Sequence, residues 1–156
     1  ILFPDPDKEL QEKVSNLCYQ LENDYLRKHG GVLYSNIRET MERLKATYHL
    51  YIVSNCQSGY IEAFLDYYHF HDLIEDFACY GDNDKPKGVN IALLYERNGL
   101  DDAVYVGDIQ GDYDESMKAG VKFIHAAYGF GTIREKVPEI HKFEDLVEAA
   151  DKVFEG

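Results

Sequence analysis

The stretch AVYVGDIQGD, residues 103–112, joins a short apolar run to a glycine and two acids. The β-branched and aromatic residues of AVYV predict a strand, and Gly107 lets the chain leave that strand sharply. Asp108 then lies at the strand tip and Asp112 at the start of the next helix, so we expect both carboxylates to face one crevice. Two close carboxylates repel each other unless a cation lies beside them, and oxygen ligands favour Mg²⁺. The plainer alternative makes Asp112 a helix N-cap and Asp108 an ordinary loop acid.

Apolar strand-like runs and amphipathic segments alternate along the rest of the chain. Helices are predicted for residues 7–29, 36–46, 61–68, 88–98, 112–118 and 143–154, and strands for residues 49–53, 77–80, 103–106 and 122–126. Asn36 followed by Glu39 is typical of a capping box at the start of the second helix. The alternation predicts an α/β fold, a Rossmann-like parallel sheet with helices on both faces. In such a sheet, ligands bind beyond the carboxyl ends of the strands.

The composition limits the classes of partner. The chain has 156 residues, which suits one domain, and its formal net charge is −13. This charge disfavours nucleic acid and anionic membrane surfaces as partners, but it allows a small phosphorylated substrate if a metal ion supplies positive charge. Three cysteines without a Cys-x-x-Cys spacing suggest neither a disulfide framework nor a zinc site, so we expect a cytoplasmic protein.

Two further polar groups follow apolar runs. Ser54 and Asn55 come directly after the strand predicted at residues 49–53, where a hydroxyl and backbone N–H groups can bind an anion. Such residues are also common as turn and cap residues. Lys85 and Lys87 lie before the helix of residues 88–98, and one lysine directed at the carboxylates could neutralise a phosphoryl group. The alternative for either lysine is a solvated surface position.

In this order, these segments resemble the haloacid dehalogenase-like (HAD) superfamily over nearly the whole chain. LYIVSNC (residues 50–56) resembles its second motif, KPKGVNI (85–91) its third and VYVGDIQGD (104–112) its fourth. FIHAAYGFGTI (123–133) resembles the segment that usually follows. The resemblance is closest to the members like phosphoglycolate phosphatase and β-phosphoglucomutase, which carry a helical cap.

The resemblance implies a role for each position. Ser54 would hydrogen-bond the phosphoryl oxygens with help from the backbone at Asn55, and Lys87 would neutralise the phosphate and the attacking carboxylate. Asp108 would ligate Mg²⁺, and Asp112 would support the metal shell and orient the lysine. Lys87 is preferred because Lys-Gly-x-Asn-Ile occurs in related sequences, although Lys85 with its proline fits the other common variant of the motif.

The nucleophile that the resemblance implies has no match in the chain. Family members attack phosphorus with an aspartate from a motif hhhhDxDGT, and water then hydrolyses the aspartyl-phosphate. The Asp-x-Asp that precedes the other motifs is Asp5-Pro6-Asp7, where Pro4 lacks the N–H that a central strand needs and Lys8 replaces the glycine. We expect Asp5 and Asp7 to form a helix-start cluster instead, where acids favour the helix dipole.

The chain is therefore expected to be a capped HAD protein without its N-terminal portion. Residues 1–31 would be a remnant of the helical cap, and residues 32–156 the core without its first strand. The expected function is that of a Mg²⁺-dependent phosphomonoesterase acting on a small phosphorylated metabolite, with this chain inactive alone. The alternatives are a non-catalytic HAD-like binding or regulatory domain, or a haloacid dehalogenase, which needs no metal and would not keep the acids at 108 and 112.

Overall fold

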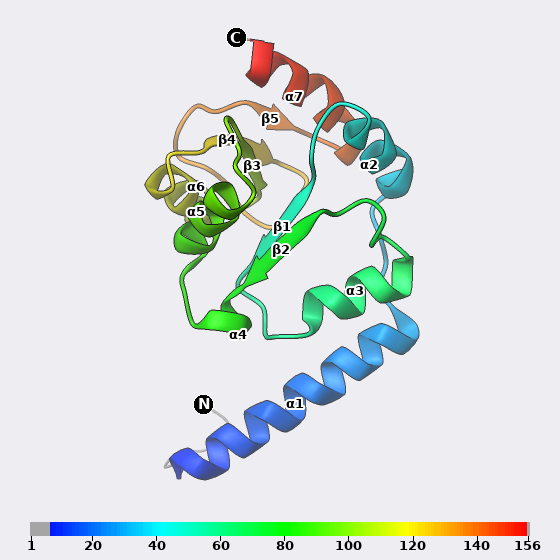
Figure 1. The fold of residues 1–156 in the computed structure, drawn as a ribbon, viewed down its shortest axis with the longest axis vertical. Coiled ribbons are helices and arrows are strands. Elements are labelled where there is room, and N and C mark those ends of the chain that lie inside the picture. The colour runs from blue at the N-terminus through cyan, green and yellow to red at the C-terminus, as the bar shows by residue number, and fades with distance from the viewer. Residues whose placement is uncertain (1–6, 156) are drawn as a thin grey trace.

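The computed structural model describes residues 7–155 as alternating helices and short strands (Figure 1). The elements in chain order are α1 (Lys8–His29), α2 (Ile37–Lys45), β1 (Tyr51–Ser54), α3 (Tyr60–Tyr68), β2 (Asp76–Cys79), α4 (Tyr80–Asn83), α5 (Lys87–Arg97), β3 (Val104–Gly107), α6 (Gln110–Lys118), β4 (Lys122–Ala126), β5 (Glu139–Ile140), the 3₁₀ turn η1 (Phe143–Asp145) and α7 (Leu146–Glu155). The predicted α/β class is confirmed, and the long helices and the four predicted strands lie within a few residues of their expected positions.

Three local expectations were wrong. Asn36 has a left-handed backbone with φ of 56°, and its side chain donates to Glu144 Oε1 at 2.6 Å, so it does not cap α2 through a capping box. Tyr80, predicted as the last residue of a strand, instead begins the single helical turn α4. The strand β5 was not predicted, because two residues are too few to show an alternating pattern.

The strands form two parallel sheets rather than one continuous sheet. β1 pairs with β2, and β4 lies between β3 and β5. No strand among residues 7–155 pairs with both β1 and β3, so the edges of these two strands are not joined by a ladder. A side chain connects them instead, because the Tyr105 hydroxyl of β3 donates to the Val53 carbonyl of β1 at 3.2 Å.

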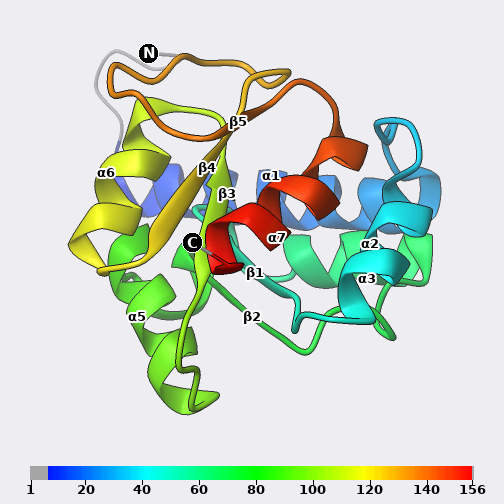
Figure 2. The same ribbon diagram turned by 90° about the horizontal axis from the view of Figure 1, so that it is seen from above.

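Helices cover both faces of the strands, as expected for a Rossmann-like fold. α5 and α6 pack on one face, against β1, β2, β3 and β4. α2 and α7 lie on the opposite side of β3 and β4, as the view from above shows (Figure 2). Leu44 of α2 and Leu146 of α7 join Ile124 and Ile140 of the sheet in one buried cluster.

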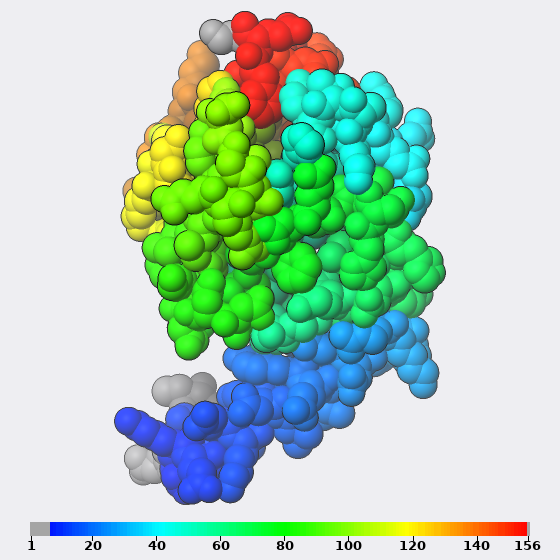
Figure 3. Space-filling model, in the orientation of Figure 1, coloured from blue at the N-terminus to red at the C-terminus, as the bar shows by residue number. Residues whose placement is uncertain are grey.

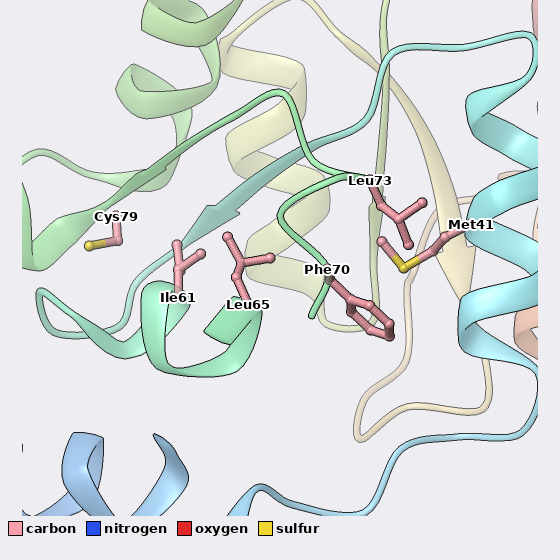
Figure 4. Close-up of a cluster of buried hydrophobic side chains, with 6 residues drawn as sticks. All are labelled: Met41, Ile61, Leu65, Phe70, Leu73 and Cys79. Carbon is pink, nitrogen blue, oxygen red and sulfur yellow. The ribbon is translucent and has the colours of Figure 1, made fainter. Parts of the chain in front are cut away.

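A second apolar cluster holds α3 and β2 together (Figure 4). Its buried members are Met41, Ile61, Leu65, Phe70, Leu73 and Cys79. Leu65 and Phe70 are almost fully buried, at 1% and 2% exposure. Ile52 of β1 and Phe77 of β2 pack against them, so this cluster fixes the strand that carries Ser54.

The helix α1 extends away from the rest of the molecule (Figure 3) and contacts α3. Asp7 caps its start by accepting a hydrogen bond from the Glu9 amide at 3.1 Å, as expected for a helix-start acid, whereas Asp5 lies outside the described residues. None of its residues is buried, and Leu10, Leu17 and Leu21 each expose more than half of their surface. No helix of residues 7–155 combines the length and the apolar composition needed to cross a bilayer.

Replacing Leu65 with alanine tests the core that fixes β1. Truncation of this buried side chain leaves a cavity. We therefore expect Leu65→Ala to lower the free energy of unfolding, measured by urea titration, by about 2–5 kcal/mol. Leu17→Ala, at a leucine 55% exposed on α1, is the matched control and should change it by less than about 0.5 kcal/mol. Equal effects of the two substitutions would contradict this assignment of the core.

Candidate functional site

The polar side chains expected at the site follow the carboxyl ends of β1 and β3. Each strand runs parallel to its own sheet neighbour, and the Tyr105 hydroxyl of β3 reaches the carbonyl of Val53, which precedes Ser54 in β1. Ser54 ends β1, and Asp108 follows β3 directly, with Asp112 in the first turn of α6. Lys87 is the first residue of α5, which packs beside α6.

A buried ion pair joins the third and fourth motifs. Lys87 Nζ donates to Asp112 Oδ1 at 2.5 Å, and the two side chains expose only 12% and 6% of their surfaces. Burial lowers the pKa of Lys87, but the nearby Tyr105 hydroxyl and the Asp112 carboxylate outweigh it and leave that pKa above its ordinary value of 10.5. Lys87 therefore remains an ammonium at neutral pH and supplies the local positive charge of an otherwise acidic chain.

The second oxygen of Asp112 holds the loop beyond β3. Asp112 Oδ2 accepts hydrogen bonds from the amides of Asp108 at 3.1 Å and Ile109 at 3.4 Å. Gly107 is required beside it, because a Cβ there would lie 2.5 Å from the Asp112 Cβ. Asp112 is the third residue of α6 and not its N-cap, which is Ile109, but it accepts the Ile109 amide at the helix start and also contacts the Lys87 ammonium.

Asp108 is covered by the loop that follows β4. Its Oδ2 accepts a hydrogen bond from the Phe130 amide at 2.8 Å. A Cβ on Gly129 would lie 2.3 Å from the Asp108 Cβ, so only glycine allows the loop to pass this close. The half-buried carboxylate is thereby fixed from one side by the loop.

Ser54 is connected to the ion pair through Tyr105. The Ser54 hydroxyl oxygen accepts the Cys56 amide at 3.2 Å, which leaves its O–H free to donate. The preceding carbonyl, of Val53, accepts the Tyr105 hydroxyl, and the Lys87 ammonium lies 5.7 Å from the centre of the Tyr105 ring. The side chain of Asn55 is exposed, so any contribution from this residue to phosphate binding remains a prediction.

The two lysines of the third motif differ in environment. Lys85 is exposed, and its backbone takes part in a turn in which Lys85 N donates to Asn83 Oδ1 at 2.9 Å. The fully buried Asn90 donates to the Lys85 carbonyl at 3.2 Å and accepts from Asn83 at 2.7 Å. This network fixes the turn so that Lys87, and not Lys85, enters the site.

The donor set is compatible with Mg²⁺. No three His, Cys, Asp or Glu side chains within residues 7–155 gather closely enough to enclose a metal ion. Mg²⁺ does not need such a cage, because it keeps several waters and binds through one or two carboxylates together with substrate phosphate. Asp108 offers a fixed carboxylate with one oxygen directed to the Phe130 amide, whereas both oxygens of Asp112 accept hydrogen bonds.

Tyr105, Gly129 and Phe130 were not predicted as site residues from the motifs. Tyr105 lies between two apolar strand residues and was predicted only as a strand residue. The alternation Tyr-Gly-Phe-Gly at residues 128–131 was a usable signal, because glycine at every second position predicts a close approach of the backbone to another group.

Asp112→Asn tests the buried ion pair. It leaves the Lys87 ammonium buried without a counter-charge, so we expect the free energy of unfolding to fall by about 3–5 kcal/mol at pH 7. Because the pKa of Lys87 is raised in the folded chain, the contribution of the pair is complete at neutral pH and is lost only as the pH rises above 10.5. The check is urea unfolding across this range.

The matched control for that variant is Glu148→Gln. The Glu148–Lys152 pair has a similar N–O distance of 2.6 Å, but its side chains are 79% and 70% exposed. Solvent screens such a pair, so little change is expected. A loss at Asp112→Asn no larger than that of Glu148→Gln would show that the ion pair does not stabilise the fold.

Comparison with known proteins agrees with the geometry of the strand ends. Residues 5–126 match the family model described as haloacid dehalogenase-like hydrolase. A search of curated proteins gives no match.

Solved structures share the fold at low sequence identity. A HAD-superfamily hydrolase of subfamily IA, variant 1, from Geobacter sulfurreducens superposes with a TM-score of 0.65 at 16% identity over 75% of this chain, which spans 55% of that protein. A HAD phosphatase from Thermococcus onnurineus has a TM-score of 0.73 at 22% identity, covering 86% of this chain and 69% of its own. A haloacid dehalogenase-like family protein from Streptococcus pneumoniae has a TM-score of 0.72 at 17% identity, covering 93% and 71%.

The family match covers well over half of the chain, and it includes the strands and helices that carry Ser54, Lys87, Asp108 and Asp112. The chain belongs to the haloacid dehalogenase-like hydrolase family.

Proposed function

We propose that this chain forms the phosphate- and Mg²⁺-binding part of a phosphomonoesterase that acts on a small phosphorylated metabolite through an aspartyl-phosphate. The observation that carries the proposal is the buried Lys87–Asp112 pair, whose acid also holds the amide of Asp108. A permanent ammonium beside a fixed carboxylate is suited to a dianionic phosphoryl group and a divalent cation.

Each side chain has one task in this proposal. The Ser54 O–H donates to a phosphoryl oxygen, and the Lys87 ammonium neutralises the charge on the phosphoryl group. Asp112 keeps Lys87 in place, and Asp108 is the carboxylate that would hold Mg²⁺. When bound, the metal would supply positive charge next to the transferring phosphoryl group.

The covalent step needs an aspartate that the described strand ends do not supply. In the reaction of this proposal, an aspartate oxygen bonds to phosphorus while the P–O ester bond breaks, and the leaving alcohol takes a proton from a second carboxylic acid. Water then hydrolyses the aspartyl-phosphate to inorganic phosphate. Among residues 7–155, the residues directly after β1, β2, β3 and β4 are Asn55, Tyr80, Asp108 and Ala127, and Asp108 is assigned to the metal.

The lack of a nucleophilic aspartate at the described strand ends favours one alternative, a non-catalytic HAD-like domain that binds a phosphorylated ligand. Determining the intact mass and N-terminal sequence of the natural protein separates the two. A preceding hhhhDxDGT segment would support the enzyme, and a natural start near Ile1 would support the binding domain. A haloacid dehalogenase is disfavoured in this proposal, because it needs no metal and would not keep the acids at positions 108 and 112.

We also propose that the protein acts in the cytoplasm. Cys18, Cys56 and Cys79 are all free thiols, which suits a reducing compartment.

Asp108→Asn tests the metal assignment. The chain is expected to bind Mg²⁺ in calorimetric titrations and to bind inorganic phosphate, followed by ³¹P NMR, more tightly when Mg²⁺ is present. Loss of the carboxylate charge should weaken Mg²⁺ binding at least about tenfold. Asp114→Asn is the control, because Asp114 is exposed on α6, the helix that follows Asp108, and accepts a hydrogen bond from Gln110. Equal weakening by both variants would remove Asp108 from the metal site.

Turnover of p-nitrophenyl phosphate with Mg²⁺ tests the missing nucleophile. We expect none from this chain, because the described strand ends carry no aspartate left to attack phosphorus once Asp108 is assigned to the metal. Turnover that survives Asp108→Asn would contradict the metal site, and turnover lost in that variant would show that the chain already contains its nucleophile.

A further inference from the structure

Four apolar or aromatic side chains lie on or against the segments around Asp108, and three of them belong to neither buried cluster, whereas Tyr128 packs against the cluster of Ile124 and Ile140. They are Tyr34, Ile109, Tyr128 and Phe130, and we call them the apolar rim. Phe130 is 95% exposed although its own amide is bonded to the Asp108 carboxylate. Tyr34 and Ile109 expose 52% and 45% of their surfaces. A phenylalanine this exposed adds almost nothing to the stability of the fold.

The backbone explains why these side chains surround the acid. Gly129 and Gly131 face Asp108 and Ile109, where a Cβ would lie 2.3 Å from the Asp108 Cβ and 2.8 Å from the Ile109 Cγ2. The residues between and before the two glycines are the aromatic residues Phe130 and Tyr128. The two glycines therefore let the backbone approach the acid closely, and the residue between them is the exposed Phe130.

A separate segment of the chain completes the rim. Tyr34 lies in the segment between α1 and α2, and its ring meets that of Tyr128 edge-on, with centroids 4.9 Å apart and an interplanar angle of 71°. This contact fixes the half-buried Tyr128 ring next to the loop over Asp108. An edge-on pair of this kind is a favourable aromatic geometry, and the exposed faces of such rings can receive another flat group.

We infer that the apolar rim binds the organic part of the substrate, and that this part is an aromatic or similarly flat apolar group rather than a polyol. This inference rests on the proposed function, in which the phosphoryl group lies at Lys87, Ser54 and Asp108. The rim contains two phenol hydroxyls and otherwise only carbon, so the hydroxyls of a sugar phosphate would find few partners among its side chains. An aryl phosphate would put its charge at the ammonium and its ring against Phe130.

Binding of three phosphates to the whole chain in the presence of Mg²⁺ tests the inference. Dissociation constants of inorganic phosphate, methyl phosphate and phenyl phosphate are measured by NMR titration for the unmodified chain, Phe130→Ala, Phe130→Tyr and Leu17→Ala. We expect phenyl phosphate to bind about fivefold to tenfold more tightly than methyl phosphate, as one favourable aromatic contact would give. Phe130→Ala should reduce this ratio to about twofold or less. Phe130→Tyr keeps the ring and should keep the ratio, as should Leu17→Ala, which removes an exposed apolar side chain on α1.

The outcomes separate this inference from the proposed function. If inorganic phosphate does not bind, the proposed function fails and the inference fails with it. If inorganic phosphate binds but the unmodified chain does not distinguish phenyl from methyl phosphate, only the inference is overturned. A ratio that Phe130→Ala leaves intact, or that Leu17→Ala also reduces, overturns it as well. So does a fall in molar mass by light scattering on Phe130→Ala, because the rim would then be an interface between copies of the chain.

Discussion

The buried pair of Lys87 and Asp112 is the constraint on which the arrangement of the site depends. It joins the first turn of α5 to the first turn of α6 and gives an acidic chain one permanently charged ammonium at the strand ends. Because the other Asp112 oxygen accepts the amides of Asp108 and Ile109, the same carboxylate fixes the lysine and shapes the loop beyond β3. The Asp112 side chain therefore helps to position both the Lys87 ammonium and Asp108, the two charged residues that the proposed chemistry requires.

Close backbone approach is the second requirement of the site. Gly107 gives room for Asp112, and Gly129 gives room for Asp108. Asp112 is thus buried, whereas Asp108 is covered by backbone on one side and remains partly exposed. This arrangement keeps the carboxylates in a single geometry without a cage of further acids, which suits a cation that shares its coordination with water and phosphate.

Much of the fold follows from local sequence patterns, and the site follows from its motifs. The β-rich runs at residues 49–53 and 122–126 predicted strands because such residues lie in a sheet. The apolar spacing of residues 7–29 predicted the helix α1, although none of its residues is buried. The sequence pattern alone did not decide which lysine of the third motif, Lys85 or Lys87, enters the site. That choice depends on the buried Asn90, which holds the turn through contacts that no periodicity reveals.

Other features depend on tertiary contacts that a single sequence does not display. Asn36 adopts a left-handed conformation because its side chain reaches Glu144, which is distant in sequence. The bond between Tyr105 and Val53 joins two separate sheets, and neither residue differs in type from an ordinary strand residue. The hydrogen bond of Phe130 to Asp108 comes from its backbone amide, which every residue except proline possesses, so the residue type does not reveal it.

The open boundary between β1 and β3 also affects how the molecule fluctuates. Within residues 7–155 these strands share no backbone ladder, and the contact between the Tyr105 hydroxyl and the Val53 carbonyl bridges their edges. Local opening at such a boundary costs less free energy than opening inside a paired sheet, because fewer backbone bonds break. Amide protons at this seam therefore exchange with solvent deuterium sooner than those of β4, which has a neighbour on each side.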